Sequence, residues 1–130
     1  MAKTGDSFEV TLKKTHVGWG TYRKTKTRGL VYNEGYFPIP SKIALSLQIT
    51  NLHNKKQTNI YKFSTSDGYF KDQYLKASGN TAKGGMYAKN MHGNGDLKLL
   101  GAWYNHAGIK AGDKLKIEFT GPFEILLTKI

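Results

Sequence analysis

The stretch KLKIEFT, residues 114–120, decides the fold class of this 130-residue chain. Leu115, Ile117 and Phe119 alternate there with charged and polar residues. Successive side chains of an extended strand point to opposite faces, so this alternation predicts a strand with an apolar face inside and a charged face in water. Gly112 and Asp113 precede the stretch as a turn. The end of the chain is therefore expected to be β-structure rather than helix.

Outward from this strand, the same alternation recurs near the start of the chain, where Phe8, Val10 and Leu12 share one face. Further extended runs are expected at residues 36–40, 47–50, 60–64, 69–77 and 123–130, separated by turns rich in glycine and polar residues. Pro38 and Pro40 exclude a central sheet position for the run that contains them. About seven strands in total predict a barrel-like β domain.

Two short helices are expected between the strands. Ser41 is the predicted N-cap of a helix through Leu47, and Asp96 of a second helix that runs through about Asn105 and ends near Gly108. Apolar stripes predict that both helices pack on the barrel. The helix residues expected in the core are Ile43, Ala44, Leu47, Leu97, Leu100, Trp103 and Tyr104. The strand aromatics expected there are Tyr36, Phe37, Phe63, Phe119 and Phe123.

The composition is that of one globular domain over residues 1–130, with 38% hydrophobic and 22% charged residues. The chain has no cysteine, which excludes disulfides and cysteine-ligated zinc. Its first residues lack the apolar run of a signal peptide, and no stretch approaches the roughly 18 apolar residues of a transmembrane helix. We therefore expect a cytoplasmic protein without a membrane partner.

Positive charge is the strongest global signal. Twenty Lys and Arg residues stand against nine Asp and Glu residues, which gives a formal net charge of +11. A chain this basic attracts polyanions. No long basic amphipathic helix points to a membrane surface, so nucleic acid is the favoured partner.

Residues 15–33 form the first candidate binding segment, because no acidic residue occurs between Glu9 and Glu34. In an extended strand, alternate residues lie about 6.6 Å apart, close to the spacing of phosphates along DNA, so one face can follow phosphates while the other turns toward bases. The segment holds both arginines of the chain, and arginine is the usual bidentate reader of guanine. The candidate contacts are Thr15, His16, Trp19, Thr21, Tyr22, Arg23, Lys24, Lys26, Thr27, Arg28 and Asn33.

Residues 78–94 form the second candidate segment, again in a gap without acidic residues, between Asp72 and Asp96. Its many Gly, Asn and Lys residues predict a protruding hairpin or loop pair. Asparagine reads adenine bidentately, serine and threonine can bond to several bases, and glycine permits close approach to a phosphate. The candidate contacts are Ser78, Asn80, Thr81, Lys83, Tyr87, Lys89, Asn90, His92 and Asn94.

The residues do not indicate an enzyme. The four histidines are scattered without the spacing of metal ligands, and nothing in the sequence indicates a metal, a cofactor or a small-molecule substrate. The only candidate for a nuclease carboxylate pair with a nearby lysine is Asp113 with Glu118 and Lys116. Because these residues are expected in a turn and on the exposed face of a strand, they do not predict an active site.

Four elements of the chain occur in a familiar order. They are FEVTL (residues 8–12), which leads to His16, Val17 and Gly18; YFPIPSKIA (36–44); the expected helix at 97–105; and GDKLKIEF (112–119). Together they resemble the DNA-binding pseudobarrel superfamily. This superfamily includes the plant transcription-factor B-three domain and the effector-binding N-terminal domain of EcoRII-type restriction endonucleases.

The resemblance implies a mainly β fold: a seven-stranded open pseudobarrel with two short α-helices. It also implies that two arms grip the major groove of double-stranded DNA like a wrench. The N-arm would be residues 15–33 and the C-arm residues 78–94, the same two segments that the charges indicate. The long N-arm favours the restriction-enzyme branch, in which this chain would be the non-catalytic recognition domain and a separate nuclease domain or chain would cut.

Two alternative functions stay open. An OB-like barrel would bind single-stranded nucleic acid by stacking bases on Trp19, Tyr22 and Tyr87. A small nuclease would instead require a divalent metal.

Overall fold

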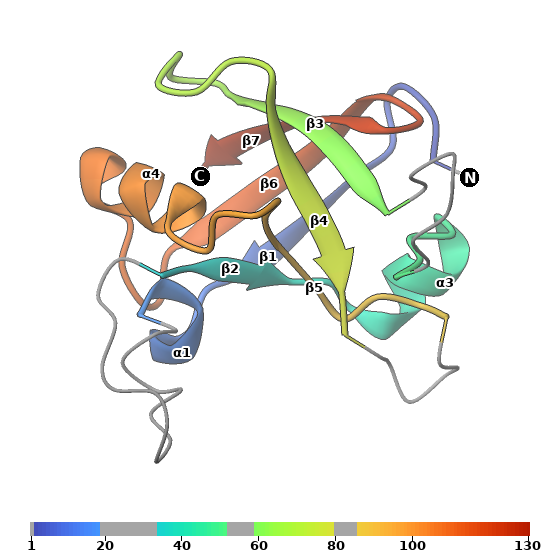
Figure 1. Ribbon diagram of the computed structural model, residues 1–130, viewed down its shortest axis with the longest axis horizontal. Coiled ribbons are helices and arrows are strands. Elements are labelled where there is room, and N and C mark those ends of the chain that lie inside the picture. The colour runs from blue at the N-terminus through green and yellow to red at the C-terminus, as the bar shows by residue number, and fades with distance from the viewer. Residues whose placement is uncertain (1, 19–33, 52–58, 80–85) are drawn as a thin grey trace.

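The alternating residues near the end of the chain form strand β6 (Lys114–Gly121) in the computed structural model, which describes residues 2–18, 34–51, 59–79 and 86–130 (Figure 1). Leu115, Ile117 and Phe119 are completely buried, as expected. β6 pairs antiparallel with β1 (Ser7–Thr11) on one side and with β7 (Glu124–Lys129) on the other. The strand with the clearest sequence pattern is therefore an inner strand of the sheet.

Four further strands complete a seven-stranded sheet within the described residues: β3 (Ile60–Thr65), β4 (Gln73–Ser78), β5 (Asn90–Gly93) and β2 (Tyr36–Pro38). The strand order is β1-β6-β7-β3-β4-β5-β2, and every pair is antiparallel except β3 with β7. The sheet curls into a nearly closed barrel (Figure 1). This confirms the mainly β, pseudobarrel-like fold. It also confirms an edge position for Pro38, because β2 ends the strand order.

Three short helices occur in the described residues: α1 (Lys14–Val17), α3 (Ser41–Ser46) and α4 (Leu99–Ala107). Two were expected, and α1 was not, because its four residues include the β-branched Thr15 and Val17 and are too few to show a helical period. None of the three has the length and apolar character needed to cross a membrane.

The predicted starts of the two expected helices are wrong. Pro40, not Ser41, occupies the cap position of α3, and Lys98, not Asp96, that of α4. The Asp96 carboxylate accepts a hydrogen bond from the Lys98 N–H (3.0 Å), and its carbonyl accepts one from Leu99 (3.2 Å). Asp96 therefore closes the turn that precedes α4. The predicted end holds, since Gly108 follows α4 with a left-handed φ of 68°.

Three predicted strand or loop assignments are also wrong. Residues 47–50 form no strand, because Gln48 adopts a φ of 53° and only Thr50 makes a bridge, to Tyr87. Residues 69–72 precede β4 and include Asp72 with a φ of 54°. In contrast, the segment expected to protrude as a hairpin or loop pair contains β5, a strand of the barrel sheet whose only large apolar residue is Met91. A strand with one apolar side chain gives too little alternation to be recognised.

The core fills the barrel and extends beneath α4. Phe37, Phe63 and Phe119 are buried as expected, and so is Trp103, whose indole N–H donates to the Asp67 carboxylate (2.9 Å) in the turn after β3. Tyr36 was expected in the core but is only half-buried, because it lies on the outer face of β2. Phe123 is partly buried against the core.

Gly93 is the position where close packing requires glycine. A Cβ atom there would lie 2.0 Å from the Asp96 carbonyl oxygen and 2.7 Å from the Leu99 Cβ, at the point where the turn before α4 rests on β5. We predict that Gly93→Ala lowers the free energy of unfolding by about 3 kcal/mol or more, because backbone must move. The control is Gly121→Ala, whose Cβ would make an ordinary contact at 3.5 Å and which should change stability by about 1 kcal/mol or less. Urea unfolding measures both, and equal effects would contradict the packing.

Candidate nucleic-acid interface

The described residues include the bases of both predicted arms. From the N-arm they include Thr15 and His16. From the C-arm they include Ser78, Tyr87, Lys89, Asn90, His92 and Asn94. The other predicted contacts lie outside the described residues: Trp19, Thr21, Tyr22, Arg23, Lys24, Lys26, Thr27, Arg28, Asn33, Asn80, Thr81 and Lys83.

α1 supports the start of the N-arm through His16. The imidazole Nδ1 accepts a hydrogen bond from the Lys13 N–H (2.9 Å), and the ring meets Tyr36 edge-on at a centroid distance of 4.9 Å. His16 is only 8% exposed. Burial, and to a lesser degree Lys13, lowers the pKa of His16 below its ordinary value. These contacts give His16 a structural role, whereas Thr15 beside it is exposed.

The chain beyond the N-arm is fixed to α4 and to the turn that precedes it. The Gly35 N–H donates to the Leu97 carbonyl (3.1 Å), and the Tyr104 hydroxyl donates to the Tyr36 carbonyl (2.9 Å). Burial raises the pKa of Tyr104 far above its ordinary value, so this hydroxyl keeps its proton and remains a donor. Gly35 admits no side chain without displacement, because a Cβ would lie 3.0 Å from the Tyr104 ring and 3.2 Å from the Gly101 nitrogen.

β2, β5 and β4 form a three-stranded surface next to both arms. In their register, Tyr36 pairs with His92, which pairs with Lys76. Pro38 pairs in the same way with Asn90, and Asn90 with Ser78. These six residues are half-buried, whereas Phe37, Met91 and Ala77 between the two rows are buried. The two rows therefore lie on the outer face of the barrel.

The arms begin and end near these two rows. The N-arm returns to the barrel just before Tyr36, at one end of β2, and the C-arm follows Ser78, whose row includes Pro38 at the other end of β2. In Figure 1, α1 lies below one end of β2, and β4 ends beside the other end of β2. We call the outer face of β2, β5 and β4, with its Lys76–His92–Tyr36 and Ser78–Asn90–Pro38 rows, the inter-arm surface. The sequence did not single out Lys76 or Tyr36 as contacts.

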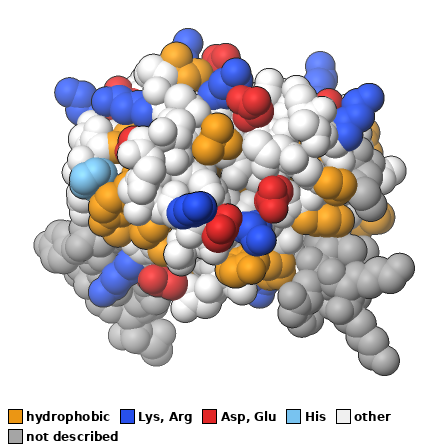
Figure 2. All heavy atoms as spheres, turned by 90° about the horizontal axis from the view of Figure 1, so that it is seen from above, with side chains coloured by type: hydrophobic (Ala, Val, Ile, Leu, Met, Phe, Trp, Pro, Cys, Tyr) orange, Lys and Arg blue, Asp and Glu red, His pale blue; other side chains and the backbone are white. Residues whose placement is uncertain are grey.

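Carboxylates are absent from the strands of the inter-arm surface. Eight of the nine acidic residues lie in β1, β6, β7 or the turns before and after them, in the turn between β3 and β4, or ahead of α4: Asp6, Glu9, Asp67, Asp72, Asp96, Asp113, Glu118 and Glu124. The ninth, Glu34, is buried. The face seen from above in Figure 2 shows cationic and anionic side chains side by side. Among the described residues, the strands of the inter-arm surface thus carry Lys76 without an acidic residue beside it in the same strands.

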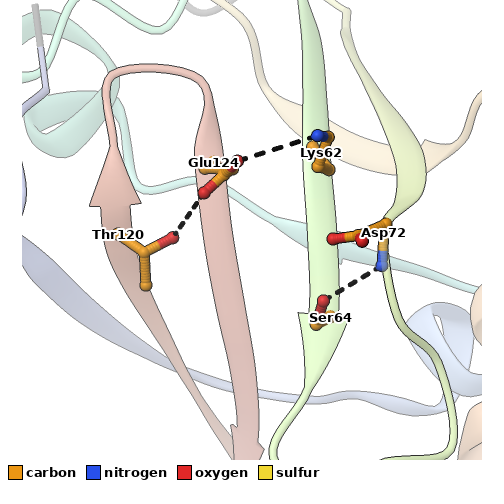
Figure 3. Close-up of polar contacts among 5 residues, drawn as sticks. All are labelled: Lys62, Ser64, Asp72, Thr120 and Glu124. Atoms are coloured by element: carbon orange, nitrogen blue, oxygen red, sulfur yellow. Dashed lines mark hydrogen bonds and ion pairs between the residues drawn. The ribbon is translucent and has the colours of Figure 1, made fainter.

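A small pocket lies on the opposite part of the sheet, between β3, β7 and the end of β6 (Figure 3). Its volume is about 140 Å³. Lys62 pairs there with Glu124 at 3.9 Å, Thr120 bonds to the same carboxylate at 3.4 Å, and the Asp72 N–H donates to the Ser64 hydroxyl at 3.1 Å. The pocket is lined by two acidic residues, Asp72 and Glu124, and the Lys62 ammonium pairs with the Glu124 carboxylate.

The residues considered for a nuclease centre do not converge. The Asp113 carboxylate accepts from the Lys110 N–H (3.0 Å) and lies 3.9 Å from the Lys129 ammonium, whereas Glu118 pairs with Lys116 at 3.7 Å. Among the described residues, no three His, Asp or Glu side chains are grouped so that they could hold a metal ion.

The lowered pKa of His16 predicts a pH-dependent stability. Below the ordinary histidine pKa of 6.5, the unfolded chain takes up a proton at this position before the folded chain does, so acid favours the unfolded state. We predict that wild-type protein loses more unfolding free energy than His16→Asn between about pH 7.5 and pH 5.5. Urea unfolding at several pH values measures the difference. Parallel pH profiles of the two proteins would show that His16 is not held neutral by its burial.

Comparison with known proteins gives the chain no family. No protein-family model matches it, and no curated protein shows significant similarity to its sequence.

Proposed function

We propose that this protein binds a specific site in double-stranded DNA, with the two arms in the major groove and the inter-arm surface facing the duplex. The observation that carries the proposal is the position of the arm bases at the two ends of β2, beside a surface without carboxylates. DNA carries about one negative charge per 1.7 Å of its axis, so a surface with unbalanced cations gains affinity by releasing counterions.

The phosphate contacts we propose come from lysines around the arms. Lys76 lies on the inter-arm surface, and Lys89 is exposed where β5 begins. Lys13 and Lys14 are exposed at α1, directly before the N-arm. Such contacts position the protein on the duplex and supply affinity that depends on salt but not on sequence.

The base contacts we propose come from the arms themselves. Arg23 and Arg28 would read guanine, and Asn80 and Asn90 would read adenine, because these side chains bond bidentately to those bases. Of the four, only Asn90 lies within the described residues, where it is half-buried on the inter-arm surface. We further propose that the chain belongs to the DNA-binding pseudobarrel superfamily, as the recognition domain of a cytoplasmic restriction endonuclease or a related stand-alone binder. Cleavage would then require a separate nuclease domain or chain.

Binding of single strands is the weaker alternative. It requires aromatic rings that are free to stack on bases. Tyr87, one of the three aromatic residues considered for it, is partly buried against the core and forms a β-bridge with Thr50. Trp19 and Tyr22 lie outside the described residues.

Selection from a randomised duplex library, with and without methylated bases, tests the proposed function. We expect one short site to be enriched, and single strands of that sequence to compete at least about tenfold less well than the duplex. Equal competition by single strands would favour the OB-like alternative. Magnesium-dependent cutting of a plasmid by the isolated chain would overturn the assignment as a non-catalytic domain.

Substitutions of charged residues distinguish phosphate contacts, which position the protein on the duplex, from base contacts, which recognise its sequence. Lys76→Ala and Lys89→Ala should weaken binding to all duplexes evenly and lower the salt slope by about one each. The matched control is Lys116→Ala, which removes the same charge from β6 and should leave affinity nearly unchanged. Arg23→Ala and Arg28→Ala should instead cost about 1–3 kcal/mol at one base-pair position. Fluorescence anisotropy over a salt series measures these effects, and an equal loss in Lys116→Ala would refute a localised interface.

A further inference from the structure

We propose that Asn51 is a positioning residue for the C-arm, fixing the two ends of residues 80–85 relative to each other. This inference rests on the proposed function. Its first support is a pair of hydrogen bonds made by one residue. The Asn51 side-chain amide donates to the Gly79 carbonyl (2.8 Å), and the Asn51 backbone N–H donates to the Met86 carbonyl (2.9 Å). Gly79 and Met86 directly flank residues 80–85.

The contact lies where β4 and β5 stop pairing with each other. Among the described residues, the pairing of β4 with β5 ends with the bond from the Lys89 N–H to the Ser78 carbonyl (2.9 Å). The next donor along the chain, the Ala88 N–H, bonds instead to the Ile49 carbonyl (3.0 Å). Together with the Thr50–Tyr87 bridge, residues 49–51 therefore run antiparallel to residues 86–88. Past the paired part of β4 and β5, Asn51 thus connects the two ends of the segment through its bonds to Gly79 and Met86.

The backbone conformation of Gly79 directs its carbonyl toward the Asn51 side chain. Its φ of +77° lies in the left-handed region, where other residues are strained. A Cβ there would also lie 3.1 Å from both the Asn90 amide nitrogen and the Lys89 Cβ. The backbone turns away from the β4–β5 ladder at this point and leaves room for the Asn90 side chain, which is itself a proposed base contact.

This arrangement also links the C-arm to the N-arm. The chain that leaves the N-arm forms β2, which pairs with β5, and then α3, which leads to Asn51. The Ile39 N–H bonds to the Lys89 carbonyl (2.8 Å) on the way. Residues 36–51 therefore hold residues 86–92 along most of their length. Base reading requires side chains held to within a fraction of an ångström by surrounding hydrogen bonds, and Asn51 supplies such a support without touching DNA itself.

Amide hydrogen exchange of the free protein tests the support. In Asn51→Ala, exchange at residues 79 and 86–89 should become about three- to tenfold faster, the range expected for one lost hydrogen bond. Exchange in β1 and β6 should stay unchanged. Asn105→Ala, which removes an exposed amide from α4, is the matched control and should leave residues 79–89 as in wild type. Unchanged exchange in Asn51→Ala would overturn the inference whether or not the protein binds DNA.

Duplex binding tests the consequence for reading. The probes are the duplex selected by the wild-type protein and a scrambled duplex of the same composition. Asn51→Ala should lower the ratio of the two affinities about three- to tenfold while the salt slope stays constant, because phosphate contacts are retained. Asn51→Gln, which keeps the amide donor, should recover part of the ratio. If Asn51 only stabilised the fold, Asn51→Ala would lower the affinity for both duplexes by the same factor, and the ratio of the two affinities would equal that of the wild-type protein. That outcome would overturn this inference, while the proposed function would stand.

Discussion

The pairing of β2 with β5 is the interaction on which the rest of this structure depends. Only three residues of β2 pair, yet each contributes differently. Phe37 fills the core, Tyr36 binds α4 through its carbonyl, and Pro38 ends the sheet. β2 also joins the end of the N-arm to β5, which lies in the later part of the C-arm. Without this pairing, the two acid-free segments would be anchored to separate parts of the barrel.

Sequence patterns predicted the elements whose burial alternates regularly. β6 was recognised because Leu115, Ile117 and Phe119 face the core, and β1 because Phe8 and Val10 do, continued by the buried Leu12 just after the strand. α4 was recognised because Leu100, Trp103 and Tyr104 form one stripe. β5 and α1 were not predicted, because each is short and has a single buried side chain: Met91 in β5 and His16 in α1. In both, pairing with distant residues stabilises the element, and local sequence carries little information about such pairing.

Charge patterns predicted the candidate interface as two segments but not as a surface. The absence of acidic residues from 10–33 and 73–95 is visible in the sequence. That Lys76 and Tyr36 lie in one row across β4, β5 and β2 depends on strand register, which pairs each of them with His92, a residue distant in the sequence. Register is set by which face is buried over the whole sheet, so it follows from the fold and not from either segment alone.

Polar residues near a predicted arm divide into two physical kinds. His16 and Asn51 are both of types that could contact a ligand, yet each directs hydrogen bonds at the protein: His16 at a helix start and Asn51 at the ends of residues 80–85. Residues that read DNA must keep donors or acceptors available, whereas those at the arm bases must use theirs internally. A polar residue at the base of an arm that directs its hydrogen bonds at the protein therefore has a positioning role rather than a contact with DNA. By this criterion, Asn51 belongs with His16 among the residues that hold the arm bases in place.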